Sequence, residues 1–351
     1  MSMDMIQTID ELVRLKASDL HLVAGNPPMI RVHGALQPLL CRPHQLSSED
    51  ILAALRDLIP ETQLADFTTC HELDIGVTIG DGYRLRVNAY IQQDSPAAAI
   101  RLLPNSFLDI RELGLDTTVL RRVIELQSGL VLVTGATGSG KSTTIASLVN
   151  DINASRACHI HTIEDPIEYR HVSKTALVTQ REVGRDTASF AEALRRSMRE
   201  DPDVIVVGEM RDLETTTAAL TLAETGHLTF ATLHTSDAVQ TISRVVSQFP
   251  AAQQAQVTIQ LASTLRYVIC QQLVPWDNGK GRSLAAEILT VTPAVRALIR
   301  DSRTHQIRNA IQTGQADGMQ TMEQALSYLV GKRLICSKTA AKFGGDPLVP
   351  S

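Results

Sequence analysis

The alternation of apolar and polar positions divides the chain into two parts with different patterns. Residues 1–100 combine short strand-like segments with two amphipathic helices, and the second helix, at 47–59, opens with a serine cap followed by acids. This pattern predicts a small α+β domain. Residues 101–118 are punctuated by proline and glycine, which predicts a linker.

From residue 119 onward, apolar strands alternate with segments of helical spacing. Segments that fit buried strands occur at 129–134, 159–164, 203–209 and 228–234. Because strand–helix alternation predicts a parallel sheet covered by helices, we expect an α/β domain over 119–345. From about residue 251 the pattern predicts mostly helices, and the tail at 346–351 is expected to fray.

Composition and charge narrow the classes of function. The 351 residues carry a net charge of −5 and only 3% aromatics, which argues against a nucleic-acid-binding surface. The five cysteines form no CxxC pair, which argues against a zinc ribbon. The acidic N-terminus does not fit a signal peptide, and no apolar run fits a membrane span, so we expect a cytoplasmic protein without membrane insertion.

The stretch GATGSGKSTT (135–144) lies between a predicted strand and a predicted helix. The spacing Gly135-x4-Gly140-Lys141-Ser142 is that of a phosphate-binding loop, in which backbone amides and a helix N-terminus hold phosphates. A flexible Gly/Ser turn is the alternative. We therefore expect ATP and Mg²⁺ as cofactors, with Ser142 on the metal. The expected nucleotide-binding residues are Gly135, Thr137, Gly138, Ser139, Gly140, Lys141, Ser142 and Thr143.

Three predicted strands that should flank this loop carry acids or a histidine at their carboxyl ends. Glu209 is our candidate for polarising the attacking water, and Glu164 is expected near the metal or the γ-phosphate. His234 ends the third strand. Helix-capping acids and a structural histidine are the alternatives. Gly208 stands where an aspartate commonly precedes the glutamate, so the chemistry alone leaves the acidic partner of the metal open.

Four segments together resemble the motor ATPases of the secretion superfamily. GATGSGKSTT, HIHTIEDPIEY, DPDVIVVGEMRD and TGHLTFATLHTSDA match, in order and spacing, the Walker A, Asp, Walker B and His boxes of that superfamily. The segment between the second and third boxes is similar to the PilT-type pilus retraction ATPases. The resemblance implies a RecA-like parallel-sheet domain with C-terminal helices, preceded by a smaller α+β, PAS-like domain.

The resemblance also assigns roles to residues. It implies that Glu209 is the catalytic glutamate, that Glu164 is the Asp-box acid, and that His227 and His234 form the His-box pair. It nominates Arg86 and Arg101 in the first domain, at RLRVNAY and AIRLLP, as positive charges at the transition state. The alternative for both arginines, a place on a surface strand, stays open.

Within the superfamily, assembly and type II secretion relatives carry an extra N-terminal domain and a four-cysteine motif, and the length and cysteine spacing of this sequence lead us to expect neither. AVRALIRD (294–301) resembles the AIRNLIRE signature of the retraction branch. The resemblance implies a hexamer that powers type IV pilus retraction and twitching motility, docked at the inner membrane on a pilus platform protein. An assembly or secretion motor, an accessory retraction paralogue, a non-motor switch and a nucleic-acid motor are the alternatives.

Overall fold

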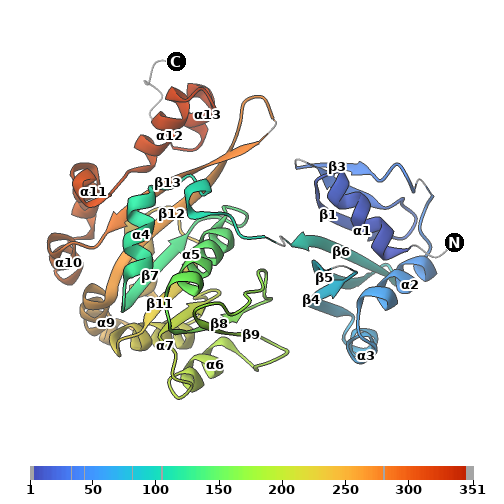
Figure 1. The fold of residues 1–351 in the computed structure, drawn as a ribbon, viewed down its shortest axis with the longest axis horizontal. Coiled ribbons are helices and arrows are strands. Elements are labelled where there is room, and N and C mark those ends of the chain that lie inside the picture. The colour runs from blue at the N-terminus through green and yellow to red at the C-terminus, as the bar shows by residue number, and fades with distance from the viewer. Residues whose placement is uncertain are drawn as a thin grey trace. The chain divides into compact units, whose positions relative to one another are not determined.

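The computed structural model describes residues 4–32, 34–42, 44–80, 82–103, 106–279 and 281–344. The tail that we expected at 346–351 lies outside these ranges. The chain forms two compact units, drawn in Figure 1. The first comprises Met1–Ser106 and Pro166–Arg170, and the second comprises Phe107–Asp165 and His171–Ser351. Each unit is described by itself.

The first unit is an antiparallel sheet with helices. In chain order its elements are α1 (Met5–Arg14), β1 (Ala17–Val23), β2 (Met29–Val32), β3 (Ala35–Pro38), α2 (Ser48–Leu58), α3 (Glu61–Cys70), β4 (Glu72–Ile79), β5 (Tyr83–Gln92) and β6 (Ser95–Leu103). The strands follow the order β3-β2-β1-β6-β5-β4. The predicted cap is confirmed, since Ser47 and Asp50 form a capping box at α2. Residues 101–103, which we expected in the linker, complete β6.

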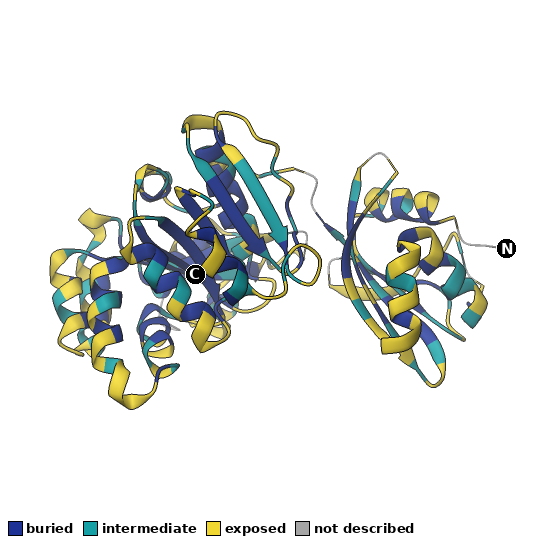
Figure 2. Cartoon of the chain, turned by 90° about the horizontal axis from the view of Figure 1, so that it is seen from below, coloured by how far each residue is buried: buried dark blue, intermediate teal, exposed yellow. Residues whose placement is uncertain are grey.

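The core of the first unit lies between one face of this sheet and its helices. Leu85, Val87 and Ala89 alternate along β5 with polar residues and are fully buried. They pack with apolar side chains of α1 and α2. Because strand side chains alternate between faces, the intervening residues Arg84, Arg86 and Asn88 point to the opposite face. Figure 2 shows the same division in the helices, whose outer sides are exposed.

The second unit contains a mostly parallel sheet. Its first elements are η1 (Ile110–Glu112), α4 (Thr117–Glu125), β7 (Gly129–Thr134), α5 (Lys141–Ser155), β8 (His159–Glu164), β9 (Leu177–Glu182), α6 (Phe190–Ser197), β10 (Val204–Val207), α7 (Leu213–Glu224), β11 (Leu228–Leu233) and α8 (Ala238–Ser247). The strand order is β13-β12-β7-β11-β10-β8-β9, with β12 and β13 defined below. All described neighbours pair in parallel except β12 and β13.

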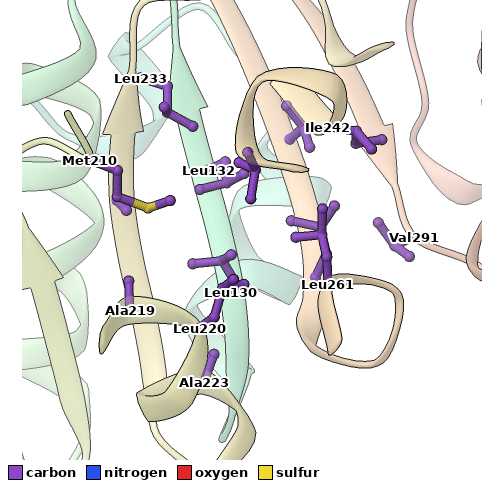
Figure 3. Packing of buried hydrophobic residues seen from close by; sticks show 14 of the residues in the cluster. Leu130, Leu132, Met210, Ala219, Leu220, Ala223, Leu233, Ile242, Leu261 and Val291 are labelled. Carbon is purple, nitrogen blue, oxygen red and sulfur yellow. The ribbon is translucent and has the colours of Figure 1, made fainter. Parts of the chain in front are cut away.

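Both faces of this sheet are covered by helices. Leu130 and Leu132 of β7 pack with Leu220, Ile242 and others on one face, as Figure 3 shows. The alternate residues of β7 pack with α4 and α5 on the other face. A strand buried on both faces favours apolar residues throughout, which explains why β10 is a continuous apolar run and why β7 and β11 are apolar apart from buried threonines. The predicted parallel sheet with helices is confirmed.

The expectation of a mostly helical region from residue 251 is wrong in part. Its elements are α9 (Ala251–Thr264), β12 (Leu265–Pro275), β13 (Arg282–Thr290), α10 (Pro293–Arg300), η2 (Thr304–Gln306), α11 (Ile307–Thr313), η3 (Gln315–Asp317), α12 (Met322–Gly331) and α13 (Ser337–Lys342). An apolar run alone does not separate a buried strand from a helix. Here β12 pairs with β7 and β13, which buries it. None of the described helices is both long and apolar enough to cross a bilayer.

Candidate nucleotide-binding and catalytic site

The predicted phosphate loop joins β7 to the N-terminus of α5. Its three glycines, Gly135, Gly138 and Gly140, have φ angles of +137°, +77° and +92°. At Gly135 a Cβ would lie 2.3 Å from the carbonyl oxygen of Gln271. This position therefore requires glycine, both for its backbone angle and for its space. The loop can curl over the start of α5 only with such residues.

Two side chains show how the loop is arranged. Lys141 Nζ donates to the carbonyl oxygens of Gly135 at 2.8 Å and Ala136 at 3.1 Å. The lysine thus lies across the loop, at the place where phosphates would sit. Ser139 Oγ is buried, and among the described residues it has no hydrogen-bond partner. Because an unpaired buried hydroxyl costs free energy, a ligand or water would stabilise this loop.

Four adjacent parallel strands bring the other candidates to the same edge of the sheet. The order β7-β11-β10-β8 places the loop, His234, Glu209 and Glu164 side by side at the carboxyl ends of their strands. This is the edge at which open α/β sheets bind ligands. The structure therefore brings together three of the acids and histidines expected at the site.

Glu209 lies just after β10 and has two basic partners. Its Oε1 lies 3.0 Å from His234 Nε2, and its Oε2 lies 2.7 Å from Arg211 Nε. The glutamate side chain is only 18% exposed, whereas that of Arg211 is 72% exposed. A largely buried carboxylate with a histidine on one oxygen is suited to orienting and polarising a water molecule.

Gly208 has a packing reason that the sequence did not reveal. A Cβ on it would lie 3.2 Å from the carbonyl oxygen of Ile163 and 3.3 Å from Glu164 Cα. Its N–H donates to that same Ile163 oxygen at 2.8 Å. The absence of a side chain lets the end of β10 approach the end of β8, and so brings the backbones of Glu209 and Glu164 together.

Glu164 at the end of β8 accepts two hydrogen bonds on one oxygen. Thr162 Oγ1 donates to its Oε1 at 2.7 Å, and Gln180 Nε2 donates to the same atom at 3.1 Å. Thr162 and Gln180 are paired residues of β8 and β9. The orientation of this carboxylate is therefore set by two neighbouring strands.

The structure does not bring His227 to this edge. It precedes β11, and its carbonyl oxygen accepts from the N–H of Gly129 at the start of β7. Its Nδ1 lies 3.0 Å from the carbonyl oxygen of Leu222, near the end of α7. His227 and His234 are seven positions apart, a separation of roughly 23 Å along a strand. Within one chain His227 stabilises a helix end, so the expected pair does not meet.

Arg86 and Arg101 belong to the first unit. They are directly paired across β5 and β6. Arg86 forms an ion pair with Asp74 at 2.5 Å, and Arg101 forms one with Asp19 at 2.9 Å. Each arginine is therefore already paired on its own sheet. Within this unit, both arginines therefore have the place that was the alternative to a catalytic role, on a surface strand.

Comparison with known proteins identifies the family. The family model described as Type II/IV secretion system protein matches residues 2–332. The chain belongs to this family. The type IV pilus retractation ATPase PilT of Pseudomonas aeruginosa is 48% identical over 345 residues, covering 98% of this chain and 99% of that protein. A twitching motility protein of Neisseria gonorrhoeae is 45% identical over 334 residues, covering 93% and 88%.

A solved member of this secretion-system family has the same fold. The crystal structure of the pilus retraction motor PilT with bound ADP matches with a TM-score of 0.90 and 44% identity, covering 99% of this chain and 98% of that one. The resemblance to the secretion-superfamily ATPases, inferred from the four boxes, and to their PilT branch, inferred from the segment between the second and third boxes, is therefore confirmed. The expected RecA-like domain with a preceding smaller domain is confirmed as well.

One buried residue of this family member was missed by the sequence analysis. Gln271 in β12 is fully buried and donates from Nε2 to Thr144 Oγ1 at 2.7 Å, in the first turn of α5. Its carbonyl oxygen is the atom that excludes a side chain at Gly135. Gln271 thus supports the phosphate loop from beneath. A glutamine within an apolar segment was the available signal, and the helical interpretation of that segment hid it.

Proposed function

We propose that the chain is an ATP-driven motor that retracts a type IV pilus. As a member of its family, it is a P-loop ATPase. The observation that supports the proposal most is the row formed by the phosphate loop, His234, Glu209 and Glu164 at one edge of one sheet. The chain is similar over almost its full length to a protein named as a retraction ATPase, and this similarity supports pilus retraction as the process that ATP hydrolysis drives.

The steps of hydrolysis follow from the chain's own residues. The loop amides and Lys141 bind the phosphates, and Lys141 exchanges its two loop carbonyls for phosphate oxygens. Glu209 orients a water molecule towards the γ-phosphate and accepts its proton. His234, at 3.0 Å from Glu209, holds that carboxylate in place. Loss of the γ-phosphate contacts then releases whatever those contacts had ordered.

The residues present fit a magnesium ion. Magnesium takes oxygen ligands and commonly binds through one or two protein groups plus substrate phosphates. Ser142 is exposed in the first turn of α5, next to the loop. Among the described residues, no cluster of three or more acids, histidines or cysteines could hold a metal alone. Ser142 would therefore hold the ion together with phosphate oxygens, and the bound ion would neutralise phosphate charge.

The further roles belong to the same proposal. Arg86 and Arg101 supply positive charge to the nucleotide, and each now forms an ion pair with an acid of its own sheet. His227, at the opposite edge of the sheet, has no place in the catalytic step within one chain. We also propose that the chain works as a homo-hexamer on a platform protein at the cytoplasmic side of the inner membrane.

The ATPase step is tested by Glu209→Gln. We expect turnover to fall by about 100-fold or more while ATP still binds, because the phosphate loop is unchanged. Glu214→Gln, an exposed residue in the first turn of α7, is the matched control. Steady-state hydrolysis and binding of a fluorescent ATP analogue measure the two effects. Wild-type turnover in Glu209→Gln would disprove the assignment, and stimulation by DNA would favour a nucleic-acid motor.

The direction of the motor is tested in cells. Cells lacking the protein should carry excess pili and lose twitching motility. The wild-type gene should restore the normal number of pili and the motility, and the Glu209→Gln gene should restore neither. Counts of surface pili by electron microscopy give the result. Bald cells would indicate an assembly motor, and unchanged pili would indicate a secretion or accessory role.

A further inference from the structure

Gln180 in β9 is a polar residue that the nucleotide chemistry does not use directly. Its side-chain amide has both ends engaged. Nε2 donates to Glu164 Oε1 at 3.1 Å, and Oε1 accepts from the backbone N–H of His171 at 2.7 Å. The amide has a donor end and an acceptor end, so this arrangement fixes which way it points. The reverse orientation would set two oxygens against each other.

We propose that Gln180 is a positioning residue for Glu164. This inference rests on the proposed role of Glu164 at the nucleotide. A glutamate side chain has three rotatable bonds, and ordering it costs about 1–2 kcal/mol. Thr162 and Gln180 offset that cost with hydrogen bonds to the same carboxylate oxygen. The carboxylate is therefore ordered before a nucleotide arrives, which is the condition for efficient catalysis.

Gln180 also bonds to the residues on either side of a loop, residues 165–170, that leads out of the second unit and back. After Glu164 the chain leaves the second unit, contributes Pro166–Arg170 to the first unit, and returns at His171. Gln180 binds the side chain at the departure point and the backbone at the return point. The N–H of Val183 adds a bond to the carbonyl oxygen of Glu164 at 2.9 Å. One side chain thus links the position of Glu164 to the position of His171, where this loop ends.

The competing explanation is that Gln180 only satisfies a backbone amide. The isosteric variant Gln180→Glu separates the two. It keeps an acceptor for His171 but places a second carboxylate against Glu164, so the pair should share one proton at lower pH. Gln180→Met removes both bonds without adding charge. The other titratable groups nearby remain in every variant: Asp165 after β8, Glu182, which pairs with Glu164, Glu209 at the end of β10, and the imidazole of His171.

The experiment measures kcat and KM for ATP between pH 6 and 8.5 in the full-length protein. We expect about a tenfold fall in kcat for Gln180→Met at every pH, with a smaller change in KM. Gln180→Glu should show a larger deficit at high pH that shrinks as the pH falls. Gln253→Glu, the same substitution at an exposed position of α9, should match the wild type throughout. Binding of a fluorescent ADP analogue checks that each variant is folded.

Two results would overturn the inference, and they differ in meaning. If Glu164→Gln loses turnover while both Gln180 variants keep the wild-type kcat and pH profile, Glu164 acts without Gln180. If Glu164→Gln itself turns over normally, the proposed role of Glu164 fails, and the positioning role fails with it. Glu209→Gln, measured in parallel, tells either result apart from a failure of the proposed ATPase mechanism.

Discussion

Glu209 has a partner on each of its carboxylate oxygens, and this limits how it can act. A water molecule that is to be polarised must share or replace His234 on Oε1 or Arg211 on Oε2. Arg211 is the more exposed of the two, and exposed ion pairs contribute little stability. We therefore expect Arg211 to be the partner that moves, leaving His234 to hold the glutamate.

His171 makes a prediction about pH. Its ring stacks on that of Phe107, with the ring centroids 4.5 Å apart, and burial lowers the pKa of His171 to about 4. The unfolded chain binds a proton near pH 6.5 and the folded chain does not, so stability falls as the pH drops from 6.5 towards 4. At pH 5 this loss is on the order of 1–2 kcal/mol.

Replacement of this histidine should remove that loss. His171→Phe keeps an aromatic ring beside Phe107 and has no group to protonate. The difference in melting temperature between variant and wild type should grow in favour of the variant from pH 7.5 to pH 5. Thermal unfolding in matched buffers measures it. A difference that does not change with pH would show that His171 is not the group responsible.

At the scale of elements, the contact between the ends of β8 and β10 is as important as any single side chain. Gly208→Ala would place a methyl group 3.2 Å from a backbone oxygen that has little room to move. We expect about 1–3 kcal/mol of destabilisation, as in other overpacked sites. We also expect a lower kcat, because Glu209 and Glu164 are displaced together.

A matched substitution isolates this effect. Gly331→Ala, at the end of α12, adds a methyl group that meets no other part of the described fold within 4 Å, so turnover should match the wild type and stability should be equal or higher by up to about 1 kcal/mol. Chemical denaturation and steady-state ATP hydrolysis measure both quantities. Gly208→Ala with unchanged stability and turnover would contradict the packing argument.

The sequence predicted the elements that have strong local signals and missed those that depend on distant partners. The loop, β8 and the capped helix α2 were expected where they occur, because each carries its own spacing or cap. The boundary between α9 and β12 was missed, since an apolar run becomes a strand only through its pairing with β7 and β13. The short strand β9 was missed for the same reason.

Parts of the candidate site follow the same rule. His234 and Glu209 end strands, so sequence order alone placed them at one edge. The family resemblance implied that His227 and His234 form a pair, but the strand between them places them at opposite edges of the sheet. The roles of Gln180 and Gln271 depend on which strands become neighbours, and the sequence holds no local sign of that.

For the whole molecule, two separate cores predict two unfolding events. The first unit has its own apolar cluster, and the larger unit has others. ADP should stabilise only the larger unit, which carries the phosphate loop, by about 2.7 kcal/mol at an ADP concentration 100 times the Kd. Only the melting temperature of that unit should therefore rise. Differential scanning calorimetry measures both transitions.

Two controls give this prediction its meaning. Lys141→Ala should abolish the shift, because the lysine is part of the loop that binds phosphate. A non-hydrolysable ATP analogue that also raises the first transition would support the proposed roles of Arg86 and Arg101. A failure of ADP to move either transition would contradict nucleotide binding by the loop.

The five residues Pro166–Arg170 belong to the first unit although the chain reaches them only after passing through part of the second. A gene fragment that ends before residue 107 would encode a unit without them, and Arg84 Nη2 would lose the carbonyl oxygen of Ile167 that it binds at 3.1 Å. The backbone passes between the two units three times, after Ser106, after Asp165 and after Arg170. One of these crossings is the peptide bond after Asp165, so a pull on the first unit is transmitted by covalent bonds to the residue next to Glu164.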